Sequence, residues 1–168
     1  ISGGKDKPIV YRDYMDAGEQ FDSRAYPKGA WVVHMIRRRL GDDLFWKVIR
    51  EYTTRFAHKN VETGDLRRTI EEVTGRTFER FFYDWTERPG CPVVSVEYKW
   101  LESDKMASVT VKQTQKEAAF VFPLRMEFVY ESEGKQTVIN RDVMQKEERF
   151  LIPLPGRPVL VRVDPEQA

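Results

Sequence analysis

The chain has 168 residues, of which 40% are hydrophobic and 12% aromatic, enough to form one ordinary domain or two small ones. The 28 Lys and Arg nearly cancel the 27 Asp and Glu, and the formal net charge of +1 argues against a nucleic-acid partner. The single cysteine, Cys91, excludes an intramolecular disulfide, a cysteine zinc knuckle and a CxxC redox pair, and it leaves the cellular compartment open.

The sequence also bears on membranes and on the extent of the polypeptide. No apolar stretch approaches the roughly 18 residues of a membrane-spanning helix, so we expect no membrane span. The chain begins at Ile1 without an initiator Met and without the apolar region of a signal peptide. We therefore expect it to be part of a longer polypeptide.

The spacing of the apolar residues changes near Pro89-Gly90. Before this point it follows a helical period, and after it apolar and polar residues alternate. This change predicts an α+β chain in two parts. We expect a short α-helical array over residues 1–90 and an antiparallel β-sandwich over residues 91–168.

The first predicted helix follows a segment without a sustained period, residues 1–22, in which we expect only one short turn around residues 12–17. Pro27 occupies a favoured first helical position, which makes Tyr26 the predicted cap, and Gly41 ends the helix. The predicted inward-facing residues recur at intervals of three or four: Ala30, Val33, Ile36 and Leu40. Arg37-Arg38-Arg39 is interpreted as a solvated helix face rather than a phosphate-binding patch.

Three more helices are expected before residue 90. The predicted caps are Asp42-Asp43 for the second helix, Thr63 for the third and Thr77 for the fourth. Gly75 is expected to end the third helix. The predicted core residues are Phe45, Val48, Ile49, Tyr52 and Phe56 on the second, Leu66, Ile70 and Val73 on the third, and Phe78, Phe81, Phe82 and Trp85 on the fourth. The helical spacing of the last set favours core packing over a ligand cage.

Alternation in the second half predicts strands. We expect them near residues 94–100, 108–112, 124–130, 136–143, 150–152 and 159–163, with turns at Ser103-Asp104, Glu133-Gly134 and Pro155-Gly156. Tyr98 and Trp100 fall at inward-facing positions. About six or seven short strands, each with one polar face, indicate a small β-sandwich.

The residues alone do not identify a reaction. The chain has no H-E-x-x-H motif, and its two histidines, His34 and His58, lack ligand partners at helical spacing, so both are interpreted as hydrogen-bonded structural imidazoles. It contains no G-x-S-x-G elbow and no glycine-rich nucleotide fingerprint. From this evidence the sequence predicts a helical unit and a β-sandwich, without a function.

One segment nevertheless resembles a known family. Its landmarks are Phe21-Asp22, Tyr26-Pro-Lys28-Gly29-Ala30, Leu40-Gly41-Asp42, Thr63-Gly-Asp65-Leu66, Pro89-Gly90-Cys-Pro92 and the closing Val161-Arg-Val-Asp164-Pro165. In this order they resemble the part of aminopeptidase N metallopeptidases that lies downstream of the zinc motif, together with the β-sandwich that follows it. The resemblance covers residues 8–165, nearly the whole chain.

The resemblance implies a zinc aminopeptidase that removes N-terminal residues from peptides. In that family two His and a Glu hold zinc, a second Glu is the general base, and a Tyr donates a hydrogen bond to the oxyanion. Tyr26 matches that tyrosine and is the catalytic residue that we assign. No residue here matches a zinc ligand, so we assign no metal or cofactor site and expect zinc in the intact enzyme only.

Further expectations follow from this resemblance. The partners implied are a peptide substrate and the rest of the catalytic domain, and the isolated chain is expected to be inactive. Lys28 is expected to point outward or to pair with an acid, and Gly29 to permit close packing of the first helical turn. The alternatives are a non-catalytic scaffold from the same family, and a β-sandwich that binds carbohydrate or protein and therefore exposes aromatic side chains.

Overall fold

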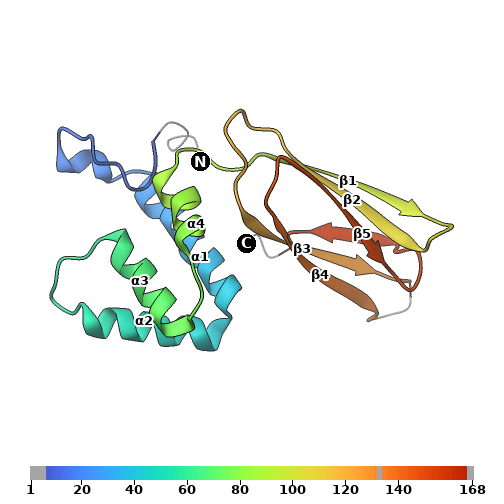
Figure 1. The fold of residues 1–168 in the computed structure, drawn as a ribbon, viewed down its shortest axis with the longest axis horizontal. Coiled ribbons are helices and arrows are strands. Elements are labelled where there is room, and N and C mark those ends of the chain that lie inside the picture. The colour runs from blue at the N-terminus through green and yellow to red at the C-terminus, as the bar shows by residue number, and fades with distance from the viewer. Residues whose placement is uncertain (1–6, 132–133, 166–168) are drawn as a thin grey trace. The chain divides into compact units, whose positions relative to one another are not determined.

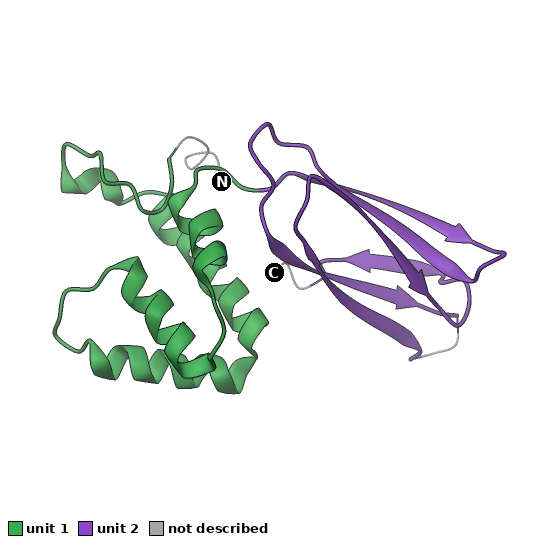
Figure 2. Cartoon of the chain, in the orientation of Figure 1, with its two compact units in different colours: residues 1–91 green, residues 92–168 purple. Residues whose placement is uncertain are grey.

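The computed structural model describes residues 7–131 and 134–165. The chain divides into two compact units, Ile1–Cys91 and Pro92–Ala168 (Figures 1 and 2). Unit 1 is helical and unit 2 consists of two antiparallel sheets, which confirms the predicted fold class. The sequence start at Ile1 and one residue of the predicted 133–134 turn lie outside the described residues. In the described ranges no helix is long and apolar enough to cross a membrane.

The described residues of unit 1 form four α-helices and three shorter turns. In chain order they are a 3-10 turn η1 (Ala17–Gln20), a π turn η2 (Arg24–Lys28), α1 (Gly29–Leu40), α2 (Asp42–Arg55), α3 (Thr63–Thr74), α4 (Glu79–Phe82) and a second π turn η3 (Tyr83–Glu87). The helical turn predicted at residues 12–17 lies slightly later, at η1. There Asp16 accepts a hydrogen bond from the backbone N–H of Gly18 at 2.6 Å.

The predicted helix ends are confirmed, whereas the predicted caps are displaced. Gly41 follows α1, and Gly75 follows α3 in the left-handed conformation, with a φ of 66°. The cap of α3 is Glu62 rather than Thr63, because the backbone N–H of Glu62 donates to Asp65 and completes a capping box. Asp42 lies inside the first turn of α2, and Phe78 rather than Thr77 precedes α4.

The core of unit 1 confirms one predicted helix face in full and two in part, and it corrects the fourth. Phe78, Phe81, Phe82 and Trp85 are all buried, as are Phe45, Val48 and Ile70. On α1, however, the buried residues are Val32, Met35 and Ile36, whereas Val33 is 39% exposed. Apolar residues occur almost all around α1, so spacing alone could not select the buried face.

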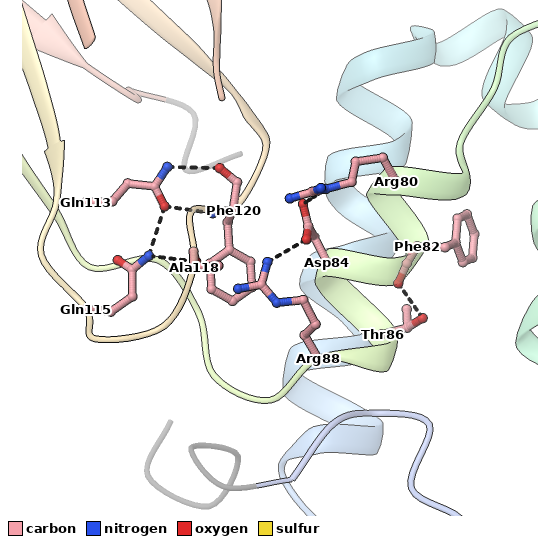
Figure 3. A network of polar contacts seen from close by, with 9 residues as sticks. All are labelled: Arg80, Phe82, Asp84, Thr86, Arg88, Gln113, Gln115, Ala118 and Phe120. Carbon is pink, nitrogen blue, oxygen red and sulfur yellow. Dashed lines mark hydrogen bonds and ion pairs between the residues drawn. The ribbon is translucent and has the colours of Figure 1, made fainter. Parts of the chain in front are cut away.

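A buried carboxylate lies at the end of unit 1. Asp84 of η3 is completely buried and forms ion pairs with Arg80 Nε at 2.8 Å and Arg88 Nη1 at 2.6 Å (Figure 3). A buried charge is tolerated only when it is paired and hydrogen-bonded. The two arginines lie four residues before and after Asp84, so the helical path itself brings the three side chains together.

In unit 2, residues 92–131 and 134–165 form six strands in two antiparallel three-stranded sheets. The strands are β1 (Val94–Leu101), β2 (Met106–Gln113), β3 (Phe122–Val129), β4 (Gln136–Val143), β5 (Glu147–Pro153) and β6 (Leu160–Val163). The sheet orders are β1-β2-β5 and β4-β3-β6. The predicted strands are confirmed with shifts of a few residues at their ends.

The core of unit 2 is built on the two central strands, β2 and β3. Val109 and Val111 of β2 and Met126 and Phe128 of β3 are completely buried. Tyr98 is on the same face of the sheet as its partner Val109, as predicted, but it lies on the edge strand and is 36% exposed.

A buried glutamine holds the loop that connects the two sheets. Gln113 accepts a hydrogen bond from the backbone N–H of Phe120 at 2.9 Å and donates to the Phe120 carbonyl at 2.9 Å (Figure 3). Gln115 donates to Gln113 at 3.0 Å. A buried amide with both of its polar atoms satisfied stabilises one conformation of this loop.

Candidate functional site

The backbone around Tyr26 forms a widened helical turn rather than a simple helix start. The backbone N–H of Lys28 donates a hydrogen bond to the carbonyl of Ser23, five residues earlier, at 3.0 Å. The backbone N–H of Gly29 likewise donates to the carbonyl of Arg24. Pro27 has no N–H, and its ring would collide with the Ser23 carbonyl in a regular α-helix, so the turn widens. Tyr26 is therefore inside η2 and is not the cap of α1, which corrects the sequence prediction.

The Tyr26 side chain projects outward from this turn. Tyr26 is 62% exposed, and its ring lies 6.3 Å from that of Phe21, which is also exposed. Within the described part of the chain, the Tyr26 hydroxyl has no hydrogen-bond partner. The phenol is thus outside the hydrophobic core and can donate a hydrogen bond to an incoming group.

A buried arginine, Arg24, precedes Tyr26 by two residues. Only 2% of its surface is exposed, and its guanidinium pairs with the Asp22 carboxylate and donates to the Glu19 carbonyl at 2.9 Å. Burial alone raises the pKa of Asp22, but hydrogen bonds from Arg24 and from the backbone of Ala25 lower it below the ordinary value of 3.8. Arg24 was not predictable as a buried residue from the sequence, because arginines are mostly exposed in proteins.

Lys28 follows Tyr26 by two residues and is also buried, with 8% of its surface exposed. Its Nζ donates to the carbonyl of Gly90 at 2.9 Å. Burial lowers the pKa of the Lys28 ammonium, and Cys91, when ionised, opposes this effect. The expectation that Lys28 points outward or pairs with an acid was wrong, since its partner is a backbone carbonyl from the end of unit 1.

Gly29 does not have the packing role that the sequence suggested. Its backbone is ordinary right-handed helix, with a φ of −59°. A Cβ added here would lie 3.8 Å from the Arg24 carbonyl oxygen, an ordinary van der Waals contact. Within the described residues nothing requires a glycine at this position.

The histidines do not form a metal site. His34 packs edge-on against Trp31, with ring centroids 5.7 Å apart, and its buried Nε2 has no hydrogen-bond partner in the structure as described. The hydrogen bond expected for this imidazole is therefore absent at Nε2. His58 is exposed, with a positive φ of 60°. Among residues 7–131 and 134–165 no three His, Cys, Asp or Glu side chains group as metal ligands, so the donor set does not fit zinc.

Two shallow depressions are lined by other residues. One, of about 260 Å³, lies on the outer face of the β1-β2-β5 sheet, with Glu97, Lys112 and Arg149 among its lining residues. The other, of about 360 Å³, is lined by residues that include Tyr11 and Val61. Tyr26 does not line either of these two depressions.

Comparisons with known proteins place the sequence in a family. The Peptidase family M1 domain matches residues 2–85, half of the chain. Aminopeptidase M1-C of Oryza sativa subsp. japonica is 37% identical over 84 residues, which are 50% of this chain and 10% of the relative. Aminopeptidase N of Lactococcus lactis subsp. lactis is 40% identical over 78 residues, 46% of this chain and 9% of the relative. The chain thus spans about a tenth of the length of these curated relatives.

A solved structure supports the fold of both units. Legionella pneumophila aminopeptidase A, crystallised in complex with aspartic acid, matches 96% of this chain and 19% of its own, with a TM-score of 0.78 and 18% sequence identity. At this identity the likeness shows the fold alone. Because the family match spans half of the sequence and is supported by relatives more than 30% identical, the chain belongs to peptidase family M1.

Proposed function

We propose that this chain is part of a zinc aminopeptidase that removes N-terminal residues from peptides. Residues 1–90 form the carboxyl-terminal portion of its catalytic domain, and residues 91–168 form the β-sandwich domain that follows. Tyr26 donates a hydrogen bond to the oxyanion that develops on the scissile carbonyl. The observation that carries this proposal is the exposed Tyr26 phenol, whose hydroxyl has no partner among the described residues.

The chemistry of a phenol suits this role. A neutral O–H donor stabilises developing negative charge without adding a full charge of its own to the site. Such a donor is effective when it is already in position, so that no bond to another protein group has to break during the reaction. Among the described residues the Tyr26 hydroxyl has no such bond to break, which supports the proposed role.

The remaining parts of the reaction are assigned to other segments of the longer polypeptide. The described residues do not fit zinc, so we assign the metal and the general base to segments outside this chain. The 168-residue chain is therefore expected to be inactive alone. A peptidase assay on the purified chain, with and without added zinc, tests this; turnover that a chelator abolishes would contradict it.

The role of Tyr26 is tested in the longer polypeptide with the variant Tyr26→Phe, which removes only the hydroxyl. We expect kcat to fall about 100- to 1000-fold, with bound zinc and melting temperature unchanged. Full activity in Tyr26→Phe would refute the proposed role. A longer polypeptide that binds no zinc and hydrolyses no peptide would instead support a non-catalytic scaffold of the same family.

A further inference from the structure

Two buried cationic side chains flank Tyr26 at equal distances along the chain. Arg24 and Lys28 are buried, whereas Tyr26 between them is mostly exposed. Arginine and lysine are rarely buried, because removing them from water is costly unless their donors are satisfied. Their burial on both sides of one exposed phenol calls for a physical explanation.

We propose that Arg24 and Lys28 are positioning residues, which fix the two ends of the turn that presents the Tyr26 hydroxyl. This inference rests on the proposed oxyanion role of Tyr26 and extends it to the residues that hold the donor in place. Neither side chain contacts substrate in this proposal.

Arg24 fixes the beginning of the turn. Its guanidinium pairs with the Asp22 carboxylate and donates to the backbone carbonyls of Glu19, at 2.9 Å, and Pro8, at 3.4 Å. Its planar group also lies over the Tyr11 ring, 5.3 Å from the centroid. The donors of a guanidinium are spread over a rigid fork, and a lysine, which is a single point donor, cannot reach these acceptors together.

Asp22, the ion-pair partner of Arg24, also accepts hydrogen bonds from the backbone of the turn. Its Oδ1 accepts hydrogen bonds from the backbone N–H groups of Arg24 at 2.8 Å and Ala25 at 3.4 Å. The carbonyl of Asp22 accepts from the N–H of Tyr26 at 3.3 Å. The residues immediately before the phenol are therefore held by both the side chain and the backbone of Asp22.

Lys28 fixes the end of the turn. Its Nζ donates to the carbonyl of Gly90, 62 residues further along the chain, at 2.9 Å. The turn is thereby connected to the last residues of unit 1. Because no described residue holds the Tyr26 hydroxyl itself, its position follows the backbone that Arg24 and Lys28 tether.

The position of the hydroxyl sets the size of the expected effect. An oxyanion donor acts at about 2.7–3.1 Å, and a displacement of about 1 Å can cost about 100-fold in rate. We therefore expect Arg24→Lys and Lys28→Met each to lower kcat about 10- to 100-fold. KM is expected to change little, because the lost interaction belongs to the transition state.

The test is a double-mutant cycle in the longer polypeptide, with kcat, KM and melting temperature measured for each variant. It combines Arg24→Lys and Lys28→Met with Tyr26→Phe. If Arg24 and Lys28 act through the Tyr26 hydroxyl, neither Arg24→Lys nor Lys28→Met lowers kcat further in the Tyr26→Phe background. Asp22→Asn, which keeps the side-chain shape, provides a milder variant in case an anchor variant does not fold.

Matched controls separate positioning from general effects of charge. Arg37 is a more exposed arginine with two hydrogen bonds of 2.8 Å to Asp42, and Lys59 is an exposed lysine that donates to the Arg55 carbonyl at 3.0 Å. Arg37→Lys and Lys59→Met are expected to retain the parent kcat.

The outcomes distinguish this inference from the proposed function. Losses that multiply in the Tyr26→Phe background would mean that the anchors act on stability or on another group, and would overturn the positioning role alone. The same conclusion would follow if Arg24→Lys, Lys28→Met and Asp22→Asn all kept the parent kcat while Tyr26→Phe lost activity. Full activity in Tyr26→Phe would overturn the proposed function and this inference together.

Discussion

Two glycines of unit 1 should respond oppositely to the same substitution. Gly29 has right-handed helical dihedrals and room for a Cβ, whereas Gly75 ends α3 with a φ of 66°. Alanine at position 29 removes conformational freedom from the unfolded chain and should stabilise unit 1 by about 0.4–1 kcal/mol. Alanine at position 75 must adopt the left-handed conformation and should destabilise it by about 1 kcal/mol.

These free energies are large enough to measure. For a unit of this size, 1 kcal/mol corresponds to a shift of about 4–8 °C in melting temperature. The assay is thermal and urea unfolding of the 168-residue chain, followed by far-ultraviolet circular dichroism, which helices dominate. Gly29→Ala should raise the helical melting temperature and Gly75→Ala should lower it. Destabilisation by Gly29→Ala would refute the reasoning, because it would show that the η2–α1 junction has no room for a methyl group.

Three further predictions concern particular side chains. The depressed pKa of Asp22 contributes stability that is present above the ordinary value of 3.8 and is lost as pH falls through the folded-state pKa. Asp22→Asn should therefore flatten the loss of stability below about pH 4 in an acid titration followed by circular dichroism, and an unchanged acid profile would contradict this contribution. Ile70→Ala in the core of unit 1 should lower the free energy of unfolding by about 2–5 kcal/mol, measured by urea unfolding. An unchanged urea midpoint would contradict the burial of Ile70. Gln113→Leu removes four hydrogen bonds in unit 2 and should lower the free energy of unfolding by about 1–3 kcal/mol. It should also accelerate limited proteolysis of residues 114–121. Unchanged cleavage would show that this loop does not depend on Gln113.

The regular parts of the fold were predictable because their signals are local. Gly41 and Gly75 ended helices as expected, and the alternation of β4 located its strand at residues 136–143. The predicted start of α3 was displaced by one residue, because Glu62 and Asp65 form the capping box there. Within the described residues the helices α1, α2 and α4 begin without a side-chain cap, so nearby polar residues did not mark their starts.

The site was only partly predictable. Tyr26 was identified by its resemblance to a family motif, but its place inside a widened turn depends on the collision that Pro27 would cause in a regular helix. The partner of Lys28 was not predictable from spacing, because Gly90 is 62 residues from Lys28 in the chain. Local patterns carry no information about such distant acceptors.

The magnitude of one hydrogen bond limits what this chain can do. Enzymes lower activation barriers by about 8–23 kcal/mol, and a single oxyanion donor supplies about 2.7–4 kcal/mol of that total. Even an ideally positioned Tyr26 hydroxyl therefore leaves most of the barrier in place. The proposed role of Tyr26 is therefore best measured as the fraction of turnover that the longer polypeptide loses when Tyr26, Arg24 or Lys28 is changed.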